Sequence, residues 1–146
     1  MDLVPRLEFS HVSSYAAFSN GIAVPVALTA GGEVVDLLAF VDTGAANCLF
    51  ERRHGELLNL DIETGQPRIF RTVTGSIEAF GHIVSMEVLG VRLESMVFFF
   101  ADERIGKNLL GREGFLRAVR AATAPAGSVP WLPGSTCRQK KNPPSS

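Results

Sequence analysis

The sequence predicts an all-β fold with one or two short helices. Apolar segments of strand length recur along most of the chain, and short turns that contain glycine separate them. Of the 146 residues, 46% are hydrophobic and 20% are charged, which is enough apolar material for a folded core. We expect one folded domain over residues 20–120, an N-terminal segment at 1–19 and a C-terminal tail at 121–146.

The first predicted element is a β-hairpin. Residues 22–29 and 34–41 are two apolar runs, and Gly31-Gly32 lies between them. Two strands joined by a short glycine turn are typical of a hairpin. Pro25 has no amide hydrogen, so the first strand should lie at an edge of the sheet or leave that position unpaired.

A second hairpin is predicted from residues 69–73 and 77–88, with a turn at 74–76. The apolar residues of its longer strand do not alternate regularly, which suggests a β-bulge near Gly81. Another strand should follow at 91–100. Its last three residues are phenylalanines, which are too apolar for a strand with one solvated face. We therefore expect them to be buried on both sides or to lie at an interface.

Two short helices are predicted. The first spans residues 51–60, is interrupted by Gly55, and is expected to turn three leucines inward: Leu57, Leu58 and Leu60. The second spans residues 113–120 and should present three apolar residues on one face: Phe115, Leu116 and Val119.

Residues 121–146 differ in composition from the rest of the chain. They contain no acidic residue and are rich in proline, glycine, serine and threonine. Such a segment buries too little apolar area to offset the entropy cost of ordering, so we expect a disordered tail. The abrupt change after Arg120 also suggests a frameshifted or truncated ending, a hypothesis that an ordered strand within residues 128–142 would contradict.

Charge and hydrophobicity narrow the classes of partner. A net charge of −1 gives no reason to expect binding to nucleic acid or to an anionic membrane. Residues 1–10 contain no apolar core of a signal peptide, and the apolar run at 96–101 is too short to span a bilayer. We therefore expect a cytoplasmic protein.

No metal and no organic cofactor is expected. Cys48 and Cys137 lack the spacing of a metal site or of a disulfide framework, so we expect two free thiols, with a Cys48–Cys137 bridge as the alternative. Cys48 should be a buried core thiol rather than a nucleophile. Three scattered histidines have no metal-binding partner at a useful spacing: His11, His54 and His82.

The most informative segment is the run Phe-Val-Asp-Thr-Gly-Ala at residues 40–45. It places Asp42 directly after an apolar strand and just before Gly44, at a predicted end of the sheet. A buried carboxylate costs free energy unless it is hydrogen-bonded or used in chemistry. Two interpretations follow: Asp42 is a turn residue that caps nearby amides, or it is a catalytic acid.

A wider pattern favours the catalytic interpretation. Asp-Thr-Gly follows an apolar strand, a hairpin with a glycine turn comes next, and Leu-Leu-Gly-Arg at residues 109–112 precedes a predicted short helix. Over residues 20–119 this pattern resembles the retropepsin-like aspartic proteases, and more narrowly their single-domain bacterial members. The resemblance implies a small closed β-barrel or sandwich with a helix near its C-terminal end.

The resemblance also implies roles for particular residues. The catalytic residue would be Asp42. The active-site loop that carries it would also contain Thr43, Gly44 and Ala45, and in the family the threonine bonds across a dimer axis. The segment that supports this loop from below would comprise Leu109, Leu110, Gly111 and Arg112. The flap that closes over the substrate would have its tip at Thr74, Gly75 and Ser76.

The predicted function is an aspartic endopeptidase that acts on extended polypeptides as a homodimer. Hydrolysis by water needs both a base and an acid, and two adjacent carboxylates supply them because the pair holds one proton, as is known for aspartic proteases. Only one Asp-Thr-Gly occurs, so the second Asp42 must come from another copy of the chain. The alternatives are a non-catalytic module that dimerises or binds peptides, and an inactive truncated or frameshifted homologue.

One departure from the family concerns Arg112. Retroviral enzymes commonly pair this arginine with an acid four residues after the catalytic aspartate, where this chain has Ala46. Arg112 would then pair with Glu113 or another acid, or the ion pair would be absent.

Overall fold

The computed structural model describes residues 16–18 and 21–118. The predictions for the tail at 121–146, including its disorder and its altered ending, lie outside the described residues. His11, Cys137 and nearly all of the N-terminal segment lie outside them as well. The domain boundaries at residues 20 and 120 therefore stay predictions.

The regular structure of the described residues is mostly β-strand with very little helix, so the all-β prediction is confirmed. The strands are β1 (Ala16–Phe18), β2 (Gly21–Ala30), β3 (Glu33–Val41), β4 (Leu49–Phe50), β5 (Gln66–Thr72), β6 (Gly75–Val88), β7 (Val91–Phe100) and β8 (Leu109–Leu110). The helical elements are α1 (Arg52–Leu57) and the 3₁₀ helix η1 (Ile62–Thr64).

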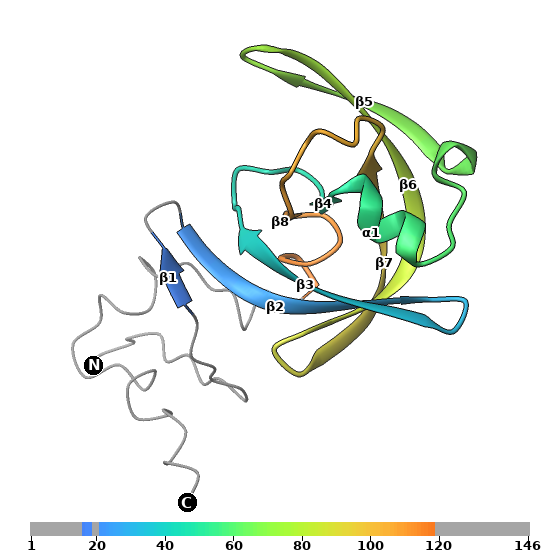
Figure 1. Ribbon diagram of the computed structural model, residues 1–146. Coiled ribbons are helices and arrows are strands. Elements are labelled where there is room, and N and C mark those ends of the chain that lie inside the picture. Colours follow the sequence, from blue (N-terminus) through green and yellow to red (C-terminus); the bar gives the residue numbers. More distant parts are fainter. Residues whose placement is uncertain (1–15, 19–20, 119–146) are drawn as a thin grey trace, which may run out of the picture. The chain divides into compact units, whose positions relative to one another are not determined.

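One sheet contains all eight strands, in the order β1-β2-β3-β8-β4-β7-β6-β5. The strand β2 also pairs with β6, and this pairing closes the sheet into a ring that runs from β2 through β3, β8, β4, β7 and β6 (Figure 1). The hairpin of β5 and β6 extends beyond this ring. The closed arrangement agrees with the predicted barrel or sandwich.

The first hairpin is confirmed. Strands β2 and β3 are antiparallel, with Ala30 opposite Glu33, and the two glycines between them have φ values of 55° and 87°. Such positive values match the two-residue turns that suit the twist of a hairpin. Pro25 pairs with Leu38 of β3, but it falls between the parts of β2 that pair with β1 and with β6. On the side of β2 that faces β1 and β6, no strand of the described residues pairs with Pro25, so its missing amide hydrogen breaks no hydrogen bond there.

The second hairpin is confirmed with two corrections. Thr72 pairs with Gly75, so the turn is Val73-Thr74, and residues 75 and 76 already belong to β6. The predicted bulge near Gly81 is wrong, because the register of β6 against β7 continues without interruption through Gly81 and Phe98. The irregular alternation has another cause. The buried side of β6 switches after Gly81, where β6 leaves β5 and approaches β2.

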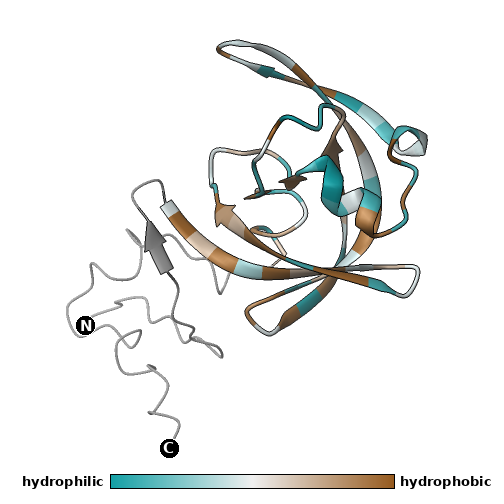
Figure 2. Ribbon diagram, viewed as in Figure 1, coloured by the Kyte–Doolittle hydropathy of each residue, from teal (hydrophilic) through white to brown (hydrophobic). Residues whose placement is uncertain are grey.

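The core centres on the end of β7. Phe98, Phe99 and Phe100 are all buried, which confirms the prediction of burial on both faces. Figure 2 shows apolar residues concentrated along β2, β6 and β7, whereas α1 is largely hydrophilic. Full burial of a phenylalanine side chain stabilises a fold by about 1.5–3 kcal/mol, so this cluster is a major part of the stability.

Helix α1 lies within the predicted span, but its packing differs from the expectation. Gly55 does not interrupt the helix. It is buried, and an added Cβ would lie 2.5 Å from Ile62 and 3.0 Å from Phe99. Leu58 lies one turn further along the same face and is also buried, whereas Leu57 points away from the core and is 60% exposed. The prediction for Leu57 is therefore wrong.

The helix predicted at residues 113–120 is absent from the described residues, which end at Ala118. Gly114 has a φ of 97°, which a right-handed helix does not allow. The chain forms a turn instead, in which the amides of Leu116 and Arg117 donate to carbonyls five residues back. Phe115 and Leu116 are nevertheless buried, as the apolar pattern predicts.

Candidate active site

Asp42 is the first residue after β3, and the neighbouring strand β8 fixes its backbone. The amide of Phe40 donates to the carbonyl of Asn108 at 2.8 Å, and the amide of Asp42 donates to that of Leu110 at 3.0 Å. These bonds extend the parallel pairing of β3 with β8 to Asp42 itself. The backbone of Asp42 is therefore held by the neighbouring strand although β3 ends at Val41.

A tight turn follows immediately. The amide of Ala45 donates to the carbonyl of Asp42 at 3.1 Å, and the amide of Gly44 donates to Oδ1 of Asp42 at 2.9 Å. The second bond is the one a turn aspartate makes, and it also fixes the direction of the carboxylate. Asp42 is half-buried, whereas Thr43 and Gly44 are exposed. The carboxylate thus stands at the surface of the single chain on a constrained backbone.

The segment after β8 fastens this loop from the other side. The amide of Arg112 donates to the carbonyl of Ala45 at 3.0 Å, and that of Glu113 donates to Ala46 at 2.8 Å. The guanidinium of Arg112 donates through Nη1 to the carbonyl of Thr43 at 2.9 Å. The structure thus brings together the two segments that the sequence singled out.

The partner of Arg112 is a backbone carbonyl instead of an acid. Glu113, the substitute considered from the sequence, pairs with Arg117. Within the described residues, no carboxylate lies at ion-pair distance from Arg112. The side chain of Arg112 therefore supports the Asp42 loop by hydrogen bonding to its main chain.

Gly111 and Cys48 form the close contact below the loop. A Cβ at Gly111 would lie 2.3 Å from the carbonyl oxygen of Asn47 and 2.9 Å from that of Ala45. The amide of Gly111 donates to Sγ of Cys48 at 3.4 Å. Cys48 is fully buried, and burial raises the pKa of its thiol to about 11. This confirms a core thiol and disfavours a nucleophile, since the thiolate is the reactive form.

Two residues that the sequence analysis did not select also hold the loop region. Oδ1 of Asn108 accepts from the amide of Glu51 at 3.0 Å, and Nδ2 of Asn108 donates to Oε2 of Glu51 at 2.8 Å. The same Asn108 supplies the carbonyl that holds Phe40. Asn108 directly precedes the Leu-Leu-Gly-Arg segment, and this position in the sequence is the signal that could have identified it.

The tip of the β5–β6 hairpin is not brought against Asp42. It extends away from the ring (Figure 1), and the hydroxyl of Thr72 donates within the hairpin to the carbonyl of Gly75 at 2.9 Å. Nearer its base, Nη1 of Arg68 donates to Oδ1 of Asn47 at 3.0 Å, which links β5 to the segment that follows the Asp42 loop. The sequence gives no signal for this pair, because the contact depends on how the ring closes.

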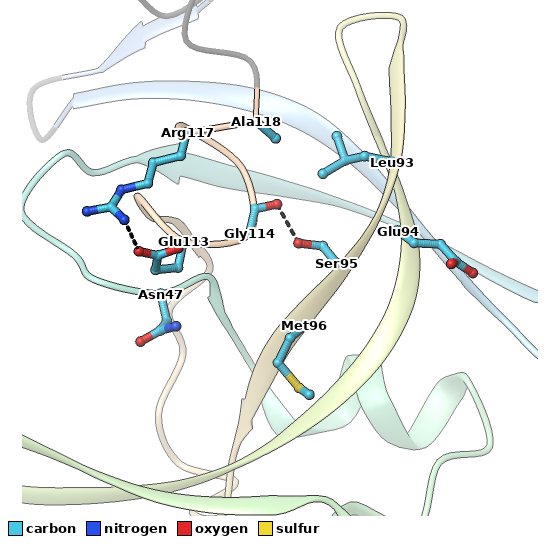
Figure 3. A pocket seen from close by; sticks show the side chains of 9 residues that line it. All are labelled: Asn47, Leu93, Glu94, Ser95, Met96, Glu113, Gly114, Arg117 and Ala118. Carbon is cyan, nitrogen blue, oxygen red and sulfur yellow. Dashed lines mark hydrogen bonds and ion pairs between the residues drawn. The ribbon is translucent and has the colours of Figure 1, made fainter.

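A separate pocket of about 360 Å³ lies between β7 and the turn at 113–118 (Figure 3). Ser95 bonds to the carbonyl of Gly114 at one wall of it, and Arg117 pairs with Glu113 at another. Asp42 does not line this pocket.

The described residues contain no cluster of three or more histidine, cysteine, aspartate or glutamate side chains that could hold a metal ion. Among the same residues, neither helical element is long and apolar enough to cross a membrane.

Comparisons with known proteins identify a family from the sequence and a similar fold from the structure. Residues 24–113 match the family model described as aspartyl protease. No curated protein matches the sequence. Among solved structures, the chain is similar to the EIAV protease complexed with the inhibitor HBY-793, with 20% sequence identity and a TM-score of 0.52. That similarity covers 67% of this chain and 86% of the other, and at this identity it concerns the fold.

Proposed function

Because this chain belongs to the aspartyl protease family, we propose that it is an endopeptidase whose catalytic group is a pair of Asp42 carboxylates, one from each subunit of a homodimer. The resemblance to retropepsin-like aspartic proteases is confirmed by the family match and by the fold. The paired carboxylates, the dimer and the polypeptide substrate are parts of the proposal.

The chemistry requires two carboxylates in one site. One of them, ionised, takes a proton from water as the water oxygen attacks the peptide carbonyl. The other, protonated, donates its proton to the carbonyl oxygen and so completes the tetrahedral intermediate. Proton transfer to the amide nitrogen then accompanies cleavage of the C–N bond. Since two carboxylates in contact cannot both ionise, the pair holds the single proton that this cycle needs.

The placement of Asp42 is the observation that carries the proposal. Its carboxylate is oriented by the amide of Gly44, and its loop is fastened to residues 108–113 through backbone bonds. Thr43 and Gly44 are exposed beside it in the single chain. A second copy could therefore approach this loop around a two-fold axis, as a symmetric interface requires.

The β5–β6 hairpin fits the role of a flap in this proposal. Its turn at Val73-Thr74 and the adjoining Gly75 and Ser76 of β6 are exposed. Closure over an extended peptide would exclude water and add main-chain hydrogen bonds along the substrate. The substrate side chains that flank the cleaved bond should be apolar.

The test compares the full chain with Asp42→Asn in cleavage of a peptide library over a range of pH. Cleavage that the variant loses, together with a dimer in sedimentation analysis, supports the proposal. Equal cleavage by both proteins contradicts it. A strictly monomeric, inactive protein would favour the alternative of a peptide-binding module or an inactive homologue.

A further inference from the structure

Arg68 occupies an unusual position on the flap strand β5. Side chains two residues apart lie on the same face of a strand, so Arg68 and Phe70 share a face. Both contact one buried ring, that of Phe98. Phe70 meets it edge-on with the ring centroids 5.5 Å apart, and the guanidinium of Arg68 lies 4.8 Å from its centroid. The guanidinium of Arg68 is thus held against the core, although the residue as a whole is exposed.

The charge of Arg68 is not balanced by an acid within the described residues. Its one hydrogen bond there goes to the neutral amide oxygen of Asn47. Arg71 and Arg112 likewise have no ion pair among the described residues, whereas five other arginines have a carboxylate at ion-pair distance: Arg52, Arg53, Arg92, Arg104 and Arg117. A guanidinium has five N–H donors, so most of those of Arg68 remain for another acceptor.

The position of Arg68 relates it to the proposed catalytic loop. Asn47, which binds it, lies five residues after Asp42 and is itself buried. The guanidinium therefore stands between the flap strand and the segment leading out of the Asp42 loop. Arg68 also lies on a strand of the β5–β6 hairpin, the proposed flap, which would cover a polypeptide bound at Asp42.

We propose that Arg68 binds an acidic side chain of the substrate, so that the protein selects polypeptides carrying aspartate or glutamate near, but not next to, the cleaved bond. This inference rests on the proposed function. A guanidinium pairs with a carboxylate through two parallel hydrogen bonds, and the contacts with Phe98 and Asn47 hold it ready for that geometry. In a two-fold dimer, one Arg68 would serve each side of the cleaved bond.

A purely structural role makes different predictions. If Arg68 only covers Phe98 and ties β5 to Asn47, its replacement will change stability without changing which peptides are preferred. The test therefore measures the preference of the protein for one peptide over another. Peptides with Asp or Glu at each position in turn are compared with the Asn or Gln equivalents, and kcat/KM is measured for each.

The wild-type chain should favour the acidic peptides by about tenfold at one or more positions, and less as salt increases. Arg68→Gln should abolish this preference, and Arg68→Glu should reverse it toward lysine and arginine. Asn47→Asp, nearly equal in shape, should weaken it by placing a carboxylate beside Arg68. Arg92→Gln is the matched control for lost charge, since Arg92 pairs with Glu87 away from the loop, and it should keep the preference.

Binding to Asp42→Asn, measured by fluorescence anisotropy with the same peptides, keeps this test independent of catalysis. No cleavage by the wild type, combined with a preference for acidic peptides in binding, would contradict the proposed function and leave the role of Arg68 standing. Absence of that preference in both binding and cleavage, or its persistence in Arg68→Gln, would overturn the inference.

Discussion

Replacing Gly111 by alanine would place a methyl carbon 2.3 Å from the carbonyl oxygen of Asn47 and 2.9 Å from that of Ala45. Ordinary contacts of a Cβ begin near 3.4 Å, so the first overlap is about 1 Å. Both obstacles are backbone atoms, which cannot move aside by a change of rotamer. Overpacking costs about 1–3 kcal/mol, and this site should lie at the upper end, near 3 kcal/mol. That corresponds to a loss of roughly 100-fold in the folding equilibrium.

Urea unfolding at one fixed protein concentration measures this cost. With a slope of about 1–3 kcal/mol per molar urea, the midpoint should fall by roughly 1–3 M. Gly106→Ala is the matched control, because a Cβ there meets nothing within 4 Å, and it should change stability by no more than about 0.5 kcal/mol. If the two variants have the same midpoint, the reasoning about the support of the Asp42 loop is refuted.

Three further predictions concern groups around the site. Because burial raises the pKa of the Cys48 thiol to about 11, the folded Cys137→Ser protein should resist iodoacetamide at about pH 8 and react once unfolded in urea; equal rates in both states would contradict this. Burial lowers the pKa of His54 from its usual value of 6.5, although the carboxylate of Glu51, 3.7 Å from Nε2 and beyond hydrogen-bond distance, partly opposes the shift. The unfolded chain therefore takes up this proton first, so stability should be complete above pH 6.5 and decrease as the pH falls from there toward the lowered folded value. Urea midpoints above and below pH 6.5 should differ less for His54→Leu than for the wild type, and an unchanged difference would exclude this contribution. Asn108→Ala removes both hydrogen bonds to Glu51, so it should lower the free energy of unfolding by about 1–3 kcal/mol and slow cleavage. Thermal unfolding and kcat measure these two effects, and a variant in which both are unchanged would show that the Asn108–Glu51 pair does not support the site.

The hairpins and the buried phenylalanines could be predicted because their signals are local. Gly31-Gly32 between two apolar runs specifies a two-residue turn without reference to the rest of the chain. The helix expected at residues 113–120 was wrong for a local reason too: its apolar pattern was read correctly, but Gly114 adopts a positive φ that no periodicity reveals.

The support of the candidate site could be predicted only in part. The segments at 42–45 and 109–112 carry a family pattern, so the sequence alone selected both. The pairs Arg68–Asn47 and Asn108–Glu51 carry none, because each joins residues that become neighbours only when the ring of strands closes. For the same reason, the sequence left open whether Arg112 forms an ion pair with an acid. In the structure it donates a hydrogen bond to the carbonyl of Thr43.

The insertion of β8 between β3 and β4 also has a consequence for synthesis of the protein. Arg112 and Thr43, which hydrogen-bond to each other, are 69 residues apart. At about 5–20 residues per second, a ribosome needs several seconds to make the intervening chain. During that interval the nascent polypeptide already carries Asp42 but lacks the strand that holds it. The order of translation thus delays assembly of the candidate site until almost the whole domain has been made.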